Sequence, residues 1–520
     1  MKALRYLDNI GYGEGLFFCF FFGFVVRLIP EVLSFPYPVG FDTVYYAARI
    51  ESGVVWYHWS SVFSSWLLYA MLVPVYNAVR FDPFLFLKLV APALYALNLC
   101  GVYYFSREGL GWDVRKSLVA AFFFAFQLAF LRISWDLYRN MLGLAILLFA
   151  LPLIQKVETK RGFALFVLMS VLVVFGHETT SVLLFAVVLG VTAKDFLKGE
   201  TARMGKVLAA VIPAVAIFSA RWWVPLLVPI DYVAETNVIS AYQPSPRPGG
   251  LFFLTNYLGL SGSIRYPTYL DLFSHVLSLF VVLYLLCLPL VFVGFFRDRF
   301  LDGWTLFLLV GAFSSLVTPF FALDIWDRWM FLLVYPFTFY AVNGIGKVLW
   351  SKSGFVLPNS RWIGWMKVSK RLMYGILFLT VLFGSLLMTV RFSDNGVFSI
   401  PTTGIYLPST MLQNTVPLRD VEGVVEAIDW LNEHMTAGSC ALLHQAFFSW
   451  GKLYLDEKNV IVHYVADVEG ALDEALENGL DPVYLIWWGE NIGWYQSIVV
   501  PSCFGQVFES DRIAAFQYLG

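Results

Sequence analysis

Isolated ionisable residues stand beside long apolar runs of this sequence, and Asp42 is the first of them. It lies in "YPVGFDTVYYAARI", residues 37–50, as the only acid among four aromatic residues. Ionisable residues in comparable places are His58, Asp136, Arg139, His177, Glu178, Asp271, His275, Asp324, Asp327 and Arg328. Charges in apolar surroundings usually lie in a polar cavity or in ion pairs, so this set predicts a hydrophilic pocket if the fold brings it together. The alternative is that each residue only marks a helix end.

Familiar catalytic motifs are absent from the sequence. "HETTS", residues 177–181, begins like the zinc-binding HExxH motif, but position 181 is Ser, and no other histidine lies at the required spacing. The sequence also has no GxSxG elbow, no P-loop and no GxGxxG at a strand-to-helix junction. The five cysteines are scattered and predict no disulfide framework, which leaves a pairing of Cys440 with Cys503 open.

The composition is that of an integral membrane protein. Hydrophobic residues make up 59% of the chain and charged residues only 14%, with a mean hydropathy of +0.70. The net charge of -2 gives no basic surface for nucleic acid. Apolar runs close to the roughly 20 residues that cross a bilayer lie at 16–33, 61–79, 84–105, 117–133, 139–155, 163–176, 179–197, 206–228, 272–296, 303–321, 328–346 and 372–391.

The positions of Lys and Arg give the orientation of these runs. Most lie in the segments 107–116, 156–162, 194–206, 297–299 and 347–371, which are expected to be cytoplasmic. They share a side with the basic N-terminus only if 61–79 does not cross, so this run is expected to lie at the outer surface. About eleven spans remain in a plasma membrane, with a cytoplasmic N-terminus.

Beyond the last apolar run, the sequence changes character. Residues 392–520 are more charged, with helix-like stretches at 418–435 and 467–480 between the strand-like runs "CALLH", "VIVHYV" and "PVYLIWW". The chain therefore divides into a transmembrane domain, 1–391, with long outer loops at 34–83 and 229–271, and a small soluble extracytoplasmic α/β domain, 392–520.

In order and spacing, these features resemble the GT-C membrane glycosyltransferases, which use polyprenyl-phosphate-linked sugars. The resemblance is carried by "RLIPEVLSFPYPVGFDTVYYAARI" after the first span, the surface helix, "SWDLYRNMLGLAILL", "DRWMFLLVYPFTFYAVNGIG" and the later "VVEAIDWLNEHM". It implies transfer of a sugar from a polyprenyl- or dolichyl-phosphate donor in the bilayer to a lipid-linked glycan or protein acceptor, with inversion.

The resemblance also implies roles for the residues introduced above. Asp42 becomes the general base that takes the proton of the acceptor hydroxyl, although the same residue could simply cap the next helix. Asp136 becomes a second catalytic carboxylate, or else the partner of Arg132 or Arg139 in an ion pair. Arg328 is expected to neutralise the donor phosphate, unless it pairs with Asp324 or Asp327. Expected to contact the donor or its sugar are His177, Glu178, Arg139, Tyr45, Tyr46 and His58.

Metal use and the exact reaction stay open at this stage. A divalent ion such as Mg²⁺ or Mn²⁺ would have Asp42 and Asp136 as its ligands, but no paired Asp-x-Asp is present. An oligosaccharyltransferase is the alternative within the same fold, although "WWGENIGW", residues 487–494, shares only two residues with the WWDYG motif of those enzymes. A secondary transporter or a non-catalytic scaffold is the alternative of another class, but no internal repeat is evident.

Overall fold

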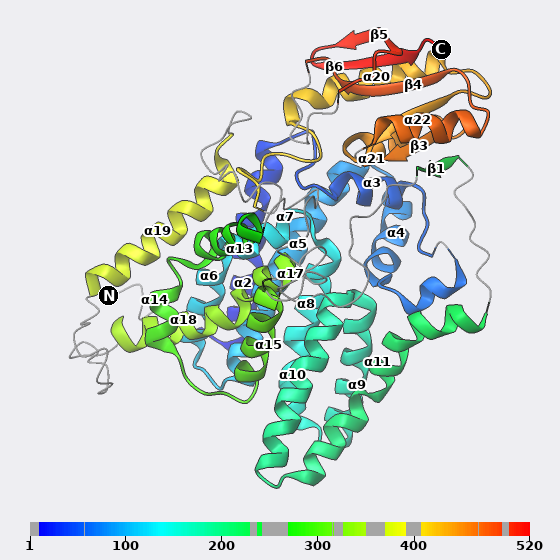
Figure 1. Cartoon of the computed structure of the whole chain (residues 1–520). Helices are drawn as coiled ribbons and strands as arrows, with labels where there is room; N and C mark the ends of the chain where they lie inside the picture. The colour runs from blue at the N-terminus through cyan, green and yellow to red at the C-terminus, as the bar shows by residue number, and fades with distance from the viewer. Residues whose placement is uncertain are drawn as a thin grey trace.

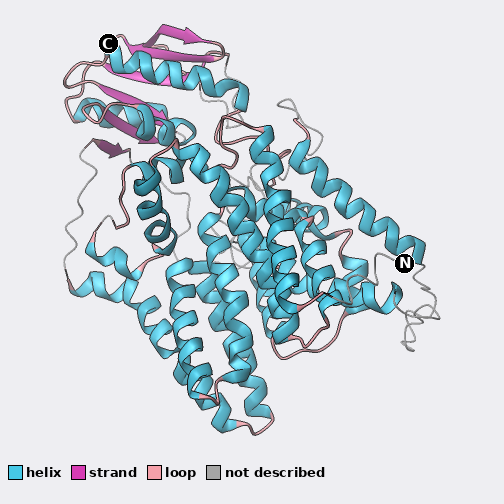
Figure 2. Cartoon of the chain, turned by 180° about the vertical axis from the view of Figure 1, so that it is seen from behind, coloured by secondary structure: helices cyan, strands magenta, loops and turns pink. Residues whose placement is uncertain are grey.

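The computed structural model describes a largely helical chain with one sheet. Described are residues 10–56, 58–228, 237–241, 269–314, 316, 326–349, 370–391, 407–465, 467–490 and 499–520. Figure 1 shows the sheet at one end of a helix bundle, with α3 beneath it, and Figure 2 shows the same arrangement from behind.

The helices before residue 390 form the bundle. Their bounds are α2 Tyr12–Leu33, α3 Thr43–Glu51, η2 Trp59–Phe63, α4 Leu67–Val79, α5 Pro83–Tyr104, η3 Phe105–Gly109, α6 Val114–Ala125, α7 Leu128–Asp136, α8 Tyr138–Ala150, η4 Leu151–Lys156, α9 Lys160–Gly176, α10 Glu178–Leu197, α11 Thr201–Leu227, α13 Tyr269–Tyr284, α14 Leu288–Gly294, α15 Leu301–Ser314, α17 Trp326–Leu332, α18 Val334–Leu349 and α19 Lys370–Thr389.

These helices make the chain a multi-pass membrane protein. Among the described residues, seven helices are long and apolar enough to cross a membrane, or up to nine if each of two bent helix pairs is one span. The bent pairs are α6 with α7, which meet at 65°, and α13 with α14, at 70°. In the second pair, Pro289 lies in the first turn of α14 and cannot donate a backbone hydrogen bond, which suits a break at this point.

The expected number of eleven spans is not confirmed. Each of the eleven runs contains a helix, but α9 has only 17 residues, fewer than the roughly 20 needed to cross, and the run at 303–321 lies partly outside the described residues. Helix α4, in the run expected to lie at the surface, has only 13 residues. It is likewise too short to cross a bilayer.

The part after residue 417 is a small α/β domain. It contains η6 Leu418–Asp420, α20 Val421–His434, β2 Cys440–His444, α21 Gln445–Tyr454, β3 Val460–Tyr464, α22 Val468–Glu477, β4 Val483–Trp488, β5 Phe504–Ser510 and β6 Ile513–Tyr518. The order of the sheet is β1-β3-β2-β4-β6-β5. β2, β3 and β4 are parallel, and β6 and β5 join antiparallel at one edge. All five cysteines of the chain are free.

The other edge strand of this sheet comes from the long loop expected at 229–271. β1, Val238–Ser240, pairs in parallel with β3, in the register Val238 to Ile461. A short piece of the transmembrane half of the sequence therefore completes the C-terminal sheet.

The helix bundle has two ends. We call the end next to the sheet the domain end and the opposite end, with the loops around 107–116, 156–160 and 194–203, the basic end. At the basic end, Lys156 pairs with Glu108 at 2.9 Å, and Lys194 pairs with Asp302 at 2.6 Å. Asp42, Asp136 and His177 lie at helix ends on the opposite side of the bundle, at the domain end.

Candidate active site at the domain end of the bundle

Asp42 immediately precedes α3, but its side chain makes no capping hydrogen bond. Its backbone is helical, with φ -82° and ψ 0°, rather than in the extended form usual for a capping residue. Asp82, in the segment between α4 and α5, behaves differently, because its Oδ1 accepts a 2.8 Å hydrogen bond from the backbone N–H of Leu85 and caps α5. The Asp42 carboxylate is therefore not used by the helix that follows it.

Charged groups from several elements surround this carboxylate. Asp136 at the end of α7, Arg132 in α7, Arg139 in α8 and Arg328 in α17 all lie within electrostatic range of Asp42. Burial, and after it the negative charge of Asp136, raise the pKa of Asp42 to about 7, although the three guanidinium groups counteract part of the shift. The fold thus brings together four of the residues expected from the sequence, and it adds Arg132.

Asp136 is the second carboxylate of the cluster. It is 3% exposed and forms a 2.6 Å ion pair with the Nη1 of Arg132, one helical turn earlier. This is the ion pair considered as the alternative role of Asp136. Because both partners are buried, the pair holds Asp136 at a fixed place beside Asp42.

Tyrosines from α3 and α4 line the other side of the cluster. The Tyr46 hydroxyl interacts with the Arg139 guanidinium group, and the Tyr46 ring stacks on Tyr138 with 5.0 Å between ring centroids. Tyr45 accepts a 3.1 Å hydrogen bond from Arg49, and Arg49 lies 3.8 Å from the ring centre of Tyr69. Tyr69 and Arg49 were not expected as site residues, since neither stands out in the sequence.

His177 joins the cluster, and Glu178 lies at its edge. His177 is 6% exposed, and its Nδ1 accepts a hydrogen bond from the backbone N–H of Thr179. Burial and the charges of Arg139, Arg328 and Arg221 lower the pKa of His177 well below its ordinary value. The ring is therefore neutral, with its proton on Nε2. Glu178 is about half-exposed and forms an ion pair with Arg221 in α11.

The remaining expected residues lie elsewhere or outside the described part of the chain. His58 contacts Ser60 through its Nδ1, at 2.5 Å, beside η2. Asp327 is half-buried next to Arg328 at the start of α17, and His275 is buried in α13. Asp324 and the side chain of Asp271 lie outside the described residues.

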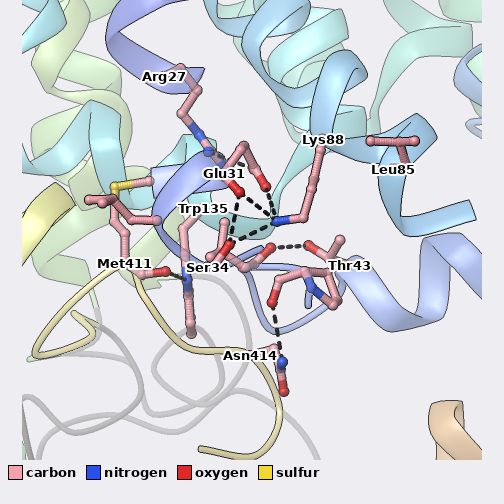
Figure 3. A network of polar contacts seen from close by, with 12 residues as sticks. Arg27, Glu31, Ser34, Thr43, Leu85, Lys88, Trp135, Met411 and Asn414 are labelled. Carbon is pink, nitrogen blue, oxygen red and sulfur yellow. Dashed lines mark hydrogen bonds and ion pairs between the residues drawn. The ribbon is translucent and has the colours of Figure 1, made fainter. Parts of the chain in front are cut away.

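A buried ion network anchors the two segments that carry the carboxylates (Figure 3). In α2, Arg27 pairs with Glu31 at 2.7 Å, and Lys88 of α5 reaches the same carboxylate at 3.3 Å. Lys88 also donates a 2.8 Å hydrogen bond to the hydroxyl of Ser34, where the loop to Asp42 begins. Arg27 further donates to the carbonyl oxygen of Ser134, just before Asp136. The network therefore positions both acidic residues without touching either.

A strap from the C-terminal part, residues 411–414, closes over the same loop. The Trp135 Nε1 donates to the carbonyl oxygens of Met411 and Gln413, each at 3.1 Å. Gly40 donates its backbone N–H to the Gln413 carbonyl at 2.8 Å. Gly40 has φ +103°, and a Cβ there would clash with the carbonyl of Trp135, so only glycine fits at this position.

The donors at this site fit a divalent cation poorly. Among the described residues, no group of three or more His, Cys, Asp or Glu side chains could hold a metal ion. Asp136 is already paired with Arg132, and two further guanidinium groups lie close to Asp42. Such a surplus of positive charge favours an anion over a cation.

Comparisons with known proteins do not assign an activity to this chain. No protein-family model and no curated protein matches the chain. Among solved structures, it is similar to the arabinofuranosyltransferase AftD from Mycobacteria, with 12% sequence identity and a TM-score of 0.49. That alignment covers 96% of this chain, which spans 40% of the length of AftD. A likeness at this level assigns neither fold nor activity.

Proposed function

We propose that this protein is a membrane glycosyltransferase of the GT-C type that transfers a sugar from a polyprenyl-phosphate donor. The observation that carries the proposal is Asp42, a carboxylate free of helix capping that lies among a second carboxylate and three arginines. A base next to a cluster of cations suits a reaction in which a hydroxyl group loses a proton while a phosphate departs. The surrounding spans would keep a lipid donor in the bilayer.

In the proposed reaction, Asp42 accepts the proton of an acceptor hydroxyl group. The hydroxyl oxygen then forms a bond to the anomeric carbon of the donor sugar, and the bond from this carbon to the phosphate oxygen breaks. Arg328 and Arg139 stabilise the charge that develops on the departing polyprenyl phosphate. One displacement inverts the anomeric configuration. The ion pair of Arg132 with Asp136 positions the acceptor.

The C-terminal domain favours transfer of one sugar over en bloc transfer of an oligosaccharide. In the oligosaccharyltransferase alternative, "WWGENIGW" would stand in for an exposed recognition motif. Trp487 and Trp488 instead lie within β4, and each is 1% exposed. Their side chains are part of the hydrophobic core of the domain. The proposed acceptor remains a lipid-linked glycan or a protein.

The experiment that tests this function uses the detergent-purified protein with short-chain polyprenyl-phosphate donors that carry a hexose or a pentose, arabinofuranose among them. Release of polyprenyl phosphate with at least one donor, dependent on an added glycan acceptor, would support the proposal. Absence of release from every donor, together with substrate uptake in liposomes, would support the transporter alternative.

The rate of this reaction should depend on pH through Asp42. Because the pKa of Asp42 is raised to about 7 and only the deprotonated form accepts a proton, kcat/KM should rise about tenfold per pH unit below about pH 7 and level off above it. Initial rates at constant ionic strength measure this profile, with a melting curve at each pH as the control for folding. A flat profile from about pH 5 to pH 8 would contradict the role of Asp42.

The proposed orientation places the basic end in the cytoplasm and the C-terminal domain outside. In a background without native cysteines, Glu158→Cys at the basic end should stay unlabelled by a membrane-impermeant thiol reagent in intact cells. Ala437→Cys in the exposed turn before β2 should react, and both should react after permeabilisation. Labelling of the Glu158→Cys variant in intact cells would contradict the proposed orientation.

A further inference from the structure

Several buried polar groups have no hydrogen-bond partner among the described residues, and two uncharged ones belong to α4 and α8 of the candidate site. They are the hydroxyl of Tyr69 in α4, a residue that is 0% exposed, and the Oδ1 of Asn140 in α8, a residue that is 5% exposed. A buried polar group without a partner is destabilising by roughly 1–3 kcal/mol. In a candidate active site, a bound ligand can supply the missing hydrogen bonds.

The Tyr69 hydroxyl lies within the tyrosine and arginine side of the cluster. Its electrostatic neighbours are Tyr46, Arg139, Tyr45 and Arg49. The Nε of Arg139 is itself buried without a partner. Tyr69 thus presents an unused hydroxyl next to one of the arginines assigned to the donor phosphate.

Asn140 lies in the first turn of α8, directly after Arg139. It precedes Gly143 by three residues, so the two share a face of the helix. Gly143 packs against Gly176, where an added Cβ would come within 2.8 Å of the Gly143 Cα, and His177 follows directly. The neutral His177 ring adds an Nε2–H donor to this region, since its Nδ1 is occupied by Thr179.

We propose that Tyr69 and Asn140 bind hydroxyl groups of the transferred sugar. This assignment rests on the proposed function and specifies the part of the donor that these residues recognise. A phenol can donate and accept and an amide oxygen can accept, so together they match hydroxyl groups on a sugar next to a phosphate held by Arg139. Sites built in this way discriminate strongly against ligands that lack the matching hydroxyl.

Tyr69 is fully buried, so the proposal requires that α4 shifts when the donor binds. This helix is short, lies outside the candidate spans, and packs against α3, α8 and α9. A small displacement of α4 on donor binding leaves the long spans in place.

The test measures binding to the detergent-purified protein by ligand-dependent thermal shift. The probes are citronellyl phosphate and citronellyl phosphates linked to glucose, mannose or arabinofuranose. The parent protein should bind at least one sugar-bearing probe about tenfold or more tightly than citronellyl phosphate. Tyr69→Phe and Asn140→Leu should each lose most of this gain, while their affinity for citronellyl phosphate stays unchanged. Their Tm without ligand should not fall, because each substitution removes a buried polar group that has no partner.

A matched control is Tyr335→Phe in α18. The Tyr335 hydroxyl donates a 2.8 Å hydrogen bond to the Oδ1 of Asn98, so this variant should lower Tm and leave both affinities unchanged. The assignment is overturned if Tyr69→Phe and Asn140→Leu keep the full gain, or if the parent binds the bare lipid phosphate but gains nothing from any sugar. A parent that binds none of the probes would overturn the proposed function, and this assignment with it.

Discussion

Replacing Asp42 with asparagine should lower the rate of sugar transfer by about 10²- to 10⁴-fold. The amide has nearly the same shape as the carboxylate but cannot accept the proton of the acceptor hydroxyl. Because the Asp42 side chain caps no helix, the variant should fold and bind donor as the parent does. Turnover with a polyprenyl-phosphate sugar donor, measured in detergent beside the parent, gives the result.

Asp82→Asn is the matched control for this substitution. Asp82 also directly precedes a helix, α5, and its side chain does cap that helix through Leu85. An asparagine caps about as well as an aspartate, so this variant should keep both stability and turnover. A near-parental rate for Asp42→Asn would remove the catalytic assignment and, with it, the main support for the proposed reaction.

Replacing Glu31 with glutamine should destabilise the protein by about 3–5 kcal/mol. Glu31 is 2% exposed and is the shared partner of Arg27 and Lys88, so its neutralisation leaves two buried cations without a counter-charge. The loss should appear as a lower Tm in detergent or lipid nanodiscs, before any effect on activity is considered.

The matched control is Glu108→Gln at the basic end. Its partner Lys156 is half-exposed, and pairs of this kind contribute only about 0–1 kcal/mol. Equal shifts in Tm for the two variants would show that the network around Glu31 does not anchor the helices as described.

Much of the fold could be predicted from local sequence patterns. Long apolar runs gave the helices of the bundle, and the helix and strand patterns after residue 417 correspond to α20, β2, β3, α22 and β4. The short strand β1 could not be predicted, because three residues carry no periodicity and their pairing with β3 is a long-range contact. Span counting was less reliable, since hydropathy alone does not show that a run such as 163–176 holds a helix shorter than a full bilayer crossing.

The site could be predicted only in part, for a related reason. Asp42, Asp136 and Arg328 stand out as charges beside apolar runs, but Arg27, Glu31 and Lys88 are hidden within such runs. The helix Tyr12–Leu33 has a mean hydropathy of 2.1 despite the buried pair that it carries. Averages over a window conceal charges that neutralise one another in the folded chain. Tyr69 stays hidden as well, because only the fold shows that its hydroxyl lacks a partner.

The strap at residues 411–414 has a consequence for the biosynthesis of this protein. The loop that carries Asp42 emerges from the ribosome early, but the acceptors for Gly40 and Trp135 belong to a segment that follows the last span. Until that segment has been translated, these donors lack their native partners. The order of synthesis therefore completes the environment of Asp42 last, and a nascent chain that stalls in the membrane would carry an unfinished site.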